Sequence, residues 1–213
     1  GGNGGSGSTG ECRVWLATDG DDSNSGTESA PVRTLLHAYD LVCPMVQGAP
    51  NGAECSGPAA RSVCIKSGTY TMTERPEFRT TRMGTANNRI IVQGAPGLTL
   101  AQRPVFDFST QPRLDCGENP DNIGGFTVNA HYVTVKNLVV RGANDSCIEL
   151  QGIEGLLENV LTYECADTGI AISSGDPFTP QARNNVVGNC DSHSHGDSQC
   201  DGENADGLAD RGR

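Results

Sequence analysis

The sequence lacks the features of several large protein classes. It has no run of 18 apolar residues, so no stretch is long enough to cross a bilayer as a helix. It has two lysines, Lys66 and Lys136, and a formal net charge of −11, which excludes the basic stripe of a nucleic-acid-binding protein. No Cys-x-x-Cys pair is present, so a structural zinc site is not expected. Gly-x-Ser-x-Gly, P-loop and His-Glu-x-x-His motifs are absent as well.

What the chain does contain is typical of a turn-rich, secreted β-protein. Glycine is abundant, at 28 residues, while apolar residues make up a modest 35%. Nine cysteines in such a chain indicate an oxidising compartment, and we predict an extracellular location. Because nine is odd, at least one thiol is free or pairs outside the chain. We expect Cys190 to pair with Cys200, and the group Cys43, Cys55 and Cys64 to staple the N-terminal region.

The chain divides into a linker and one domain. Residues 1–11 are rich in Gly and Ser, which predicts a flexible linker left by removal of an upstream segment, and residues 12–213 form the domain. An apolar stripe from Pro31 to Pro44 predicts one amphipathic helix that covers the first turn of the fold. The loop 19–26 faintly resembles a calcium loop, but a solvated turn is favoured. Short β-branched runs predict strands at 13–17, 62–66, 89–93, 104–108 and 126–128.

The second half of the chain repeats itself every 22 residues. Asn137 and Asn159 end similar apolar runs 22 positions apart, and Ile148 and Ile170 keep the same offset. Asn189 follows Asn159 by 30 positions, which fits the repeat if Ser173–Pro180 is an eight-residue insertion. Fixed periods of this size indicate stacked coils, and Asn tolerates the left-handed backbone of a sharp corner. We therefore predict an all-β solenoid of 22-residue coils with a ladder of corner asparagines; a jelly roll or sandwich is the alternative.

The densest polar segment runs from residue 189 to residue 211. Its carboxylates are the hard oxygen ligands that Ca²⁺ prefers, although an acidic, solvated loop is the competing interpretation. An i, i+2 pair of histidines, His193 and His195, could hold a transition metal on a strand; on a loop, which we favour here, the pattern carries no function. The six acidic residues of this segment are Asp191, Asp197, Asp201, Glu203, Asp206 and Asp210.

Two motifs in this segment resemble a known family. Asn189-Cys-Asp-Ser and, further on, Gly202-Glu-Asn-Ala-Asp-Gly-Leu-Ala209 are similar to motifs of the family-nine polysaccharide lyases, which are pectate lyases with a right-handed parallel β-helix. The opening from Val14 and the segment Ile65–Tyr70 are shared more widely among secreted β-helix proteins. The resemblance extends from about Val14 to the end of the chain and implies a right-handed parallel β-helix here.

The resemblance also implies a reaction and a metal. It implies calcium-assisted β-elimination on pectate or another uronate polymer, with Asp206 as a Ca²⁺ ligand and Glu203 as a weaker candidate. The family's remaining ligands and its catalytic lysine lie downstream of the matched motif, so no catalytic residue is assigned; Arg211 is not promoted to a base. We therefore expect the chain to be the N-terminal part of a longer enzyme and to be inactive alone.

Other functions are compatible with the same pattern. A non-catalytic glycan-binding β-helix and a β-helix glycoside hydrolase with paired carboxylates are the two alternatives. For all three, the expected partner is a polysaccharide, an acidic one for the lyase. Neither nucleic acid nor a membrane span is expected, and we expect a monomer.

Overall fold

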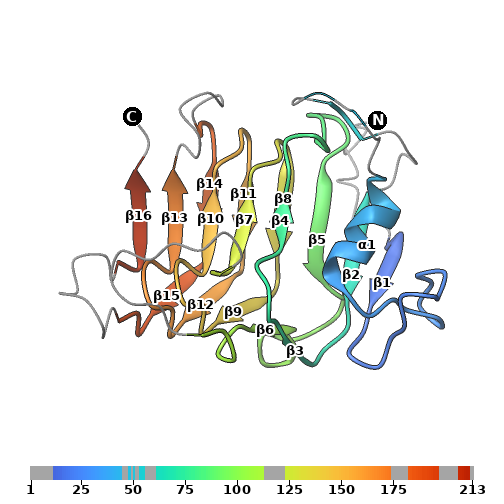
Figure 1. The fold of residues 1–213 in the computed structure, drawn as a ribbon, viewed down its shortest axis with the longest axis horizontal. Helices are drawn as coiled ribbons and strands as arrows, with labels where there is room; N and C mark the ends of the chain where they lie inside the picture. The colour runs from blue at the N-terminus through green and yellow to red at the C-terminus, as the bar shows by residue number, and fades with distance from the viewer. Residues whose placement is uncertain are drawn as a thin grey trace, which may run out of the picture.

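The chain winds into three parallel β-sheets that run the length of the molecule (Figure 1). The computed structural model describes residues 12–44, 48, 50, 53–55, 61–112, 123–173, 182–196 and 206–211. In chain order, the elements in these ranges are β1 Val14–Leu16, α1 Leu35–Val42, β2 Ser62–Ile65, β3 Thr69–Thr71, β4 Glu77–Phe78, β5 Ile90–Gly94, the 3₁₀ helix η1 Leu100–Gln102, β6 Val105–Asp107, β7 Phe126–Val128, β8 Val133–Lys136, β9 Val139–Arg141, β10 Ile148–Leu150, β11 Leu156–Glu158, β12 Leu161–Tyr163, β13 Ile170–Ser173, β14 Val186–Gly188, β15 Asp191–His193 and β16 Leu208–Arg211.

The strands of successive coils lie directly over one another. The three sheets have the orders β1-β2-β5-β8-β11-β14, β4-β7-β10-β13-β16 and β3-β6-β9-β12-β15, and every pair within them is parallel. Ile148 pairs with Ile170 in the ladder, so 22 residues make up one complete coil. The chain is an all-β, right-handed parallel β-helix, and the jelly-roll or sandwich alternative is wrong because those folds pair their strands antiparallel.

The corner asparagines have the predicted backbone. Asn137, Asn159 and Asn189 have φ angles of 56°, 54° and 51°, which is the left-handed region that asparagine tolerates better than most residues. Each lies between a strand of the β8–β11–β14 sheet and a strand of the β9–β12–β15 sheet, so each turns the chain from one sheet to the next. The 30-residue step to Asn189 also stays in register, because Leu156 faces Val186. The predicted insertion at Ser173–Pro180 lies outside the described residues after Ser173.

Helix α1 packs against the first coil, as predicted, but it is shorter than the apolar stripe. It begins after Thr34, whose hydroxyl accepts a hydrogen bond from the His37 amide. Val32 is fully buried and forms a parallel bridge with Leu16 instead of a helical turn. The prediction that the helix starts at Pro31 was therefore wrong, because pairing with β1 holds this segment extended. All five predicted strands are present.

The core is a continuous column of side chains inside the three sheets. Phe106 lies edge-on to Phe126, with ring centroids 4.9 Å apart, and Phe126 lies edge-on to Phe78 at 6.2 Å. Tyr39 of α1 extends this aromatic stack at 4.8 Å from Phe78. Phe106 and Phe126 belong to different sheets, so these edge contacts cross the interior and fill the N-terminal half of the solenoid with buried rings.

Disulfides tie the chain at three places in the described residues. Cys12–Cys64 and Cys43–Cys55 hold the N-terminal region, so the predicted stapling is confirmed, although Cys64 pairs with Cys12. Cys147–Cys165 lies in the middle of the solenoid. Cys190 is a free thiol, so the predicted Cys190–Cys200 pair is wrong. Cys190 directly follows corner residue Asn189, and its sulfur packs against the Gly188 carbonyl at 3.3 Å.

None of the helices in the part of the chain that the structure describes has the length and apolar character that a membrane crossing requires.

Candidate functional site

Asp206 lies where a strand enters the sheet that faces the viewer in Figure 1. We call the start of strands β7, β10, β13 and β16 the strand-entry edge. Along this edge the backbone oxygens of Ser146, Thr168 and Asp206 accept hydrogen bonds from Gly125, Cys147 and Gly169, at 2.9, 2.9 and 2.8 Å. These three acceptors therefore occupy the same place in consecutive coils. The Asp206 side chain is exposed at the last of them.

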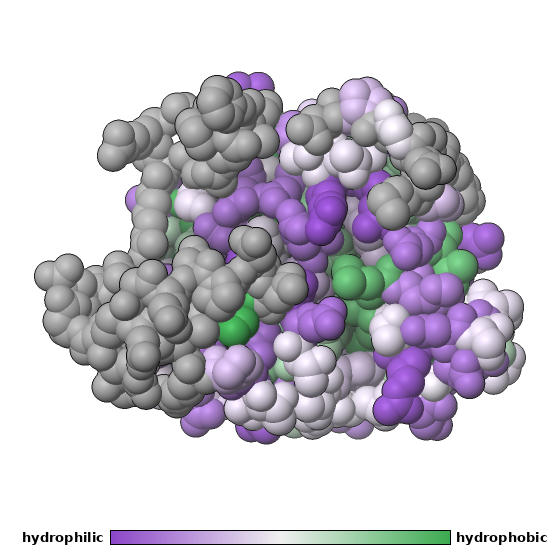
Figure 2. Space-filling model, viewed as in Figure 1, coloured by the Kyte–Doolittle hydropathy of each residue, from purple (hydrophilic) through white to green (hydrophobic). Residues whose placement is uncertain are grey.

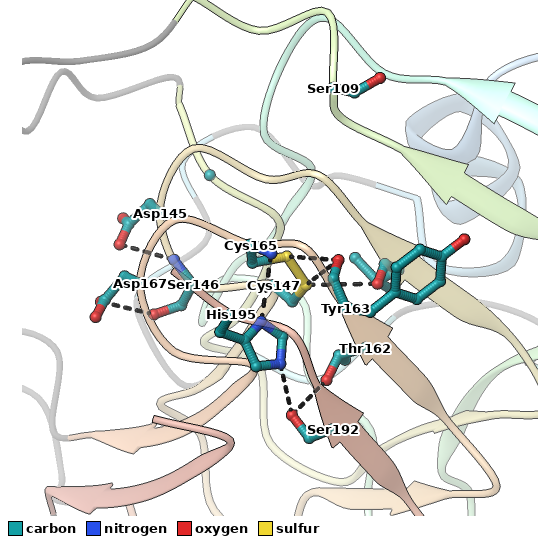
Figure 3. Close-up of a disulfide and its surroundings, with 12 residues drawn as sticks. Ser109, Asp145, Ser146, Cys147, Thr162, Tyr163, Cys165, Asp167, Ser192 and His195 are labelled. Carbon is teal, nitrogen blue, oxygen red and sulfur yellow. Dashed lines mark hydrogen bonds between the residues drawn. A yellow bond between two sulfur atoms is a disulfide. The ribbon is translucent and has the colours of Figure 1, made fainter. Parts of the chain in front are cut away.

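Two further aspartates lie on the same edge, one position earlier in their coils. Asp145 accepts a hydrogen bond from the Ser146 amide at 2.8 Å, and Asp167 accepts one from the Ser146 hydroxyl at 3.2 Å. Ser146 thus links the two carboxylates across one coil (Figure 3). Burial raises the pKa of Asp145; the Ser146 amide opposes that rise, and the neighbouring Asp167 charge adds to it.

Of the six acidic residues of this segment, the structure describes three, and these three do not share one sheet. Asp191 belongs to β15 in a different sheet from Asp206 and Asp210, which belong to the β16 coil edge and strand. Glu203, the weaker ligand candidate, lies outside the described residues, as do Asp197 and Asp201. Asp145 and Asp167 were not predicted as site residues, although their 22-residue spacing places them in neighbouring coils.

The outer face of this sheet is polar. Asn129 donates a hydrogen bond to Glu77 at 3.0 Å, and Ser173 donates one to Glu149 at 2.5 Å. Thr127 lies between the two glutamates in the ladder, facing Glu77 on one side and Glu149 on the other. Figure 2 shows hydrophilic surface across the middle of this face, where β4, β7 and β10 lie, and an apolar patch beside it in the region of α1. The face offers hydroxyl, amide and carboxylate groups together.

A second polar group lies inside the solenoid, just behind the strand-entry edge (Figure 3). The Cys165 amide donates to His195 Nδ1 at 3.3 Å, and His195 Nε2 lies 2.9 Å from the Ser192 hydroxyl. Ser192 donates to the Gly207 carbonyl at 2.6 Å and lies 2.7 Å from the Thr162 hydroxyl. Burial lowers the pKa of His195, with the His193 charge acting in the same direction.

The two histidines do not converge on one ligand. His193 ends β15 and is exposed, and its ring stacks on Tyr163 with centroids 5.6 Å apart. Ser194 has a left-handed φ of 57°, which turns the chain and sends His195 inward. The hypothesis of a shared His193–His195 metal site is therefore wrong. The inward turn could have been expected from the spacing, because His195 follows Cys165 by the same 30 positions that separate Asn189 from Asn159.

The donor atoms at the two places suit different metals. Asp206, Asp167 and Asp145 offer the hard carboxylate oxygens that Ca²⁺ prefers, although the three do not converge within 4.8 Å of one another. Cys147, Cys165 and His195 bring sulfur and nitrogen atoms within 4.8 Å of one another, a soft donor set, with the two sulfurs joined in the disulfide.

These features define a parallel β-helix protein with an acidic edge on one sheet. A family model described as the Pel9A-like right-handed β-helix region matches residues 14–213, and the chain belongs to this family. The resemblance to family-nine polysaccharide lyases is confirmed.

Two relatives show how far the similarity extends. Pectate lyase L of Paenibacillus polymyxa (strain SC2) is 28% identical over 209 residues, which are 89% of this chain and 43% of that protein. The crystal structure of pectate lyase Pel9A superposes with a TM-score of 0.66 at 23% identity, over 94% of this chain and 44% of that one. The chain therefore spans less than half the length of the relatives it matches.

Proposed function

We propose that the protein is a secreted polysaccharide lyase that cleaves a uronate polymer, such as pectate, by calcium-assisted β-elimination. The observation that carries this proposal is the exposed carboxylate of Asp206 at the strand-entry edge, in a chain of the Pel9A-like family. A named relative, Pectate lyase L, supports the substrate class. The proposal concerns the whole encoded protein, because this chain covers less than half of its relatives.

Asp206 would hold the calcium ion, with Glu203 as a second candidate. Calcium, when bound, neutralises the uronate carboxylate and makes the neighbouring C5 proton more acidic. Two observations support this role for Asp206: its carbonyl accepts from the Gly169 amide at 2.8 Å, which holds the backbone at the edge, and its side chain is exposed. Asp167 and Asp145 extend the negative potential of the same edge, which attracts a cation.

The polar outer face supports a sugar polymer as the substrate. Sugar rings present many hydroxyl groups, and the Glu77–Asn129 and Glu149–Ser173 pairs present acceptors and donors to them on neighbouring coils. A net charge of −11 would repel a polyuronate by itself. A cation at the strand-entry edge would reconcile the acidic protein with its acidic substrate.

The disulfides support secretion. Three disulfides among the described residues fit an oxidising compartment such as the cell exterior. An acidic, extracellular polysaccharide is accessible to an enzyme there, so the proposed location and substrate agree.

The experiment measures β-elimination as the rise in ultraviolet absorbance of the unsaturated product from polygalacturonate. We expect the complete encoded protein to form this product with Ca²⁺ and to stop when the calcium is chelated. Asp206→Asn should reduce kcat/KM by roughly 100-fold or more, since a direct ligand matters at least as much as an outer-shell group. The matched control is Asp191→Asn, an exposed carboxylate of β15 in another sheet, which should keep full activity.

Different results would support the other functions. Retention of polygalacturonate without any unsaturated product would indicate a glycan-binding module, and saturated reducing ends would indicate a hydrolase. We expect residues 1–213 to be inactive alone, because they span less than half the length of the lyases that they match. Calcium-dependent product formation by this chain alone would contradict that expectation.

A further inference from the structure

The Cys147–Cys165 disulfide and His195 occupy adjoining coils at one inner corner. Cys165 lies below His195 in the stack, since the Gly196 amide donates to the Cys165 carbonyl at 3.1 Å. Cys147 lies below Gly169, because the next residues, Ile148 and Ile170, are paired. Gly169 has no side chain, and the space that its Cβ would take is filled by Ser192 and His195. The His195 ring therefore lies over Cys147, in the space that a side chain at Gly169 would otherwise fill, and close to the disulfide.

Hydrogen bonds fix which nitrogen of His195 faces the sulfur atoms. Nδ1 accepts from the Cys165 amide, so in the neutral ring the proton is on Nε2, which donates to Ser192. Ser192 can accept this bond because its own proton goes to the Gly207 carbonyl. Figure 3 shows Nδ1 on the side of the disulfide. The unprotonated nitrogen therefore lies on the side of the sulfur atoms, and its one lone pair accepts from the Cys165 amide; a metal bound there would take the place of this hydrogen bond.

We propose that Cys147, Cys165 and His195 bind one zinc ion when the disulfide between the two cysteines is reduced. A phosphine reductant breaks the sulfur–sulfur bond: the phosphine supplies two electrons, water supplies two protons to the sulfurs, and the oxygen of that water leaves with the phosphine as its oxide. Zinc then replaces the two thiol protons, which are released, and His195 binds as the neutral ring. In the oxidised protein the same two sulfurs form the disulfide, so the two states exclude each other.

The geometry requires only small movements. The three ligand atoms lie within 4.8 Å of one another, and sulfur atoms around a tetrahedral zinc are about 3.8 Å apart at Zn–S distances of about 2.3 Å. Breaking the disulfide lets its sulfurs separate to that distance. A pocket of about 300 Å³ lined in part by Cys165, Ser194 and Gly196 lies beside the corner, so water can approach Cys165 from that side.

The test uses cobalt, which reports thiolate ligands by colour. The chain carries Cys190→Ala to remove its free thiol, is reduced with a phosphine, and is titrated with Co²⁺ and then Zn²⁺ without oxygen. We expect one equivalent of Co²⁺ to give thiolate charge-transfer bands and tetrahedral d–d bands, and Zn²⁺ to displace it. Without the reductant, neither band should form.

Variants separate this site from any other thiol. His195→Ala and Cys147→Ser should each weaken Co²⁺ binding at least roughly 10–100-fold, since even outer-shell changes cost that much. His193→Ala is the matched control: it lies two residues away on the exterior and should bind Co²⁺ like the parent. Equal Co²⁺ affinity in the His195→Ala and parent proteins would overturn the proposal. The same result is expected if reduction unfolds the chain and its thiols bind the metal without His195, so that case would overturn it as well. Absence of the bands in the reduced parent would overturn it too.

Discussion

The side-chain amide of Asn159 donates a hydrogen bond to the side-chain oxygen of Asn137, 22 residues earlier, at 3.1 Å. Both residues have left-handed backbones at the same corner of successive coils. The Asn137 oxygen therefore satisfies one donor of Asn159 while the chain turns between two sheets. This contact joins the corners of two coils that the backbone ladders already hold in register.

Substitution of Asn159 should separate the two roles of this residue. Asn159→Ala loses the hydrogen bond and places an alanine at φ 54°, so we expect a loss of about 1–3 kcal/mol in the free energy of unfolding. Asn159→Gly loses the bond but accepts the backbone angle, and should cost about 1 kcal/mol less than alanine. Denaturant unfolding of the three proteins measures both values. Equal losses for Ala and Gly would show that the backbone angle carries no strain.

The repeat and the corner residues could be predicted from the sequence because they depend on local rules. A period of 22 in apolar runs requires stacking, and asparagine marks the left-handed corner in each coil. The strands around Val14, Ile90 and Phe126 followed from β-branched and aromatic runs for the same reason. These features repeat along the chain, so each coil supports the prediction made from the others.

The remaining features depend on contacts that spacing does not encode. The helix starts at Leu35 because Val32 pairs with β1, a partner in space that the apolar stripe cannot show. The free thiol of Cys190 depends on which cysteines lie near it in space, and the odd count of nine does not specify that. The aspartate column at the strand-entry edge appears only once the coils are stacked in register.

Gly169 should not tolerate a side chain. An alanine Cβ there would meet the Ser192 hydroxyl, the His195 ring and the Gly207 carbonyl. We expect Gly169→Ala to destabilise the fold by about 1–3 kcal/mol, as overpacking of a tight site does. The loss appears as a lower denaturant midpoint at an unchanged slope.

Gly188 provides the matched control for this substitution. It also lies in the C-terminal coils, but its Cβ would meet nothing within 4 Å. Gly188→Ala should leave the midpoint within about 0.5 kcal/mol of the parent. In the Gly169→Ala background, removing the clashing hydroxyl by Ser192→Ala should cost less than it does in the parent. Strict additivity of the two changes would argue against the clash.

Asp107 should make the fold sensitive to acid. Burial acts to raise the pKa of its carboxyl, but hydrogen bonds from Ser109 and the Arg141 guanidinium, 2.7 Å away, lower it below the ordinary 3.8. Between the lowered and the ordinary pKa the unfolded chain binds more protons, so this stabilisation is complete above the ordinary pKa and is lost as pH falls through the lowered one. Asp107→Asn should flatten the decline of unfolding free energy in this acidic window, which denaturant unfolding at several pH values measures.

Asp145 should act in the opposite direction. Its pKa in the fold is raised above the ordinary 3.8, first by burial and then by the charges of Asp167 and Glu149. Between the two values the folded chain binds more protons, so stability falls as pH rises through this window. Asn at this position keeps an acceptor for the Ser146 amide and carries no charge. Asp145→Asn should therefore be more stable than the parent at neutral pH, and the two should converge near pH 3, where both side chains are neutral by the ordinary aspartate pKa of about 3.9.

Thermal unfolding across pH 3–7 tests this difference, a range of about four units that brackets ordinary carboxyl titration. The Asp145–Asp167 repulsion accounts for part of the expected loss of stability at neutral pH. Adding Ca²⁺ in the same experiment therefore gives a second test, because a bound cation would reduce that repulsion. If a cation is attracted to this edge, it should raise the melting temperature of the parent more than that of Asp145→Asn, which has already lost one of the repelling charges. If the stability curves of parent and variant run parallel from acid to neutral pH, ionisation of Asp145 does not destabilise the fold. The strand-entry edge would then lack the excess negative potential that attracts a cation.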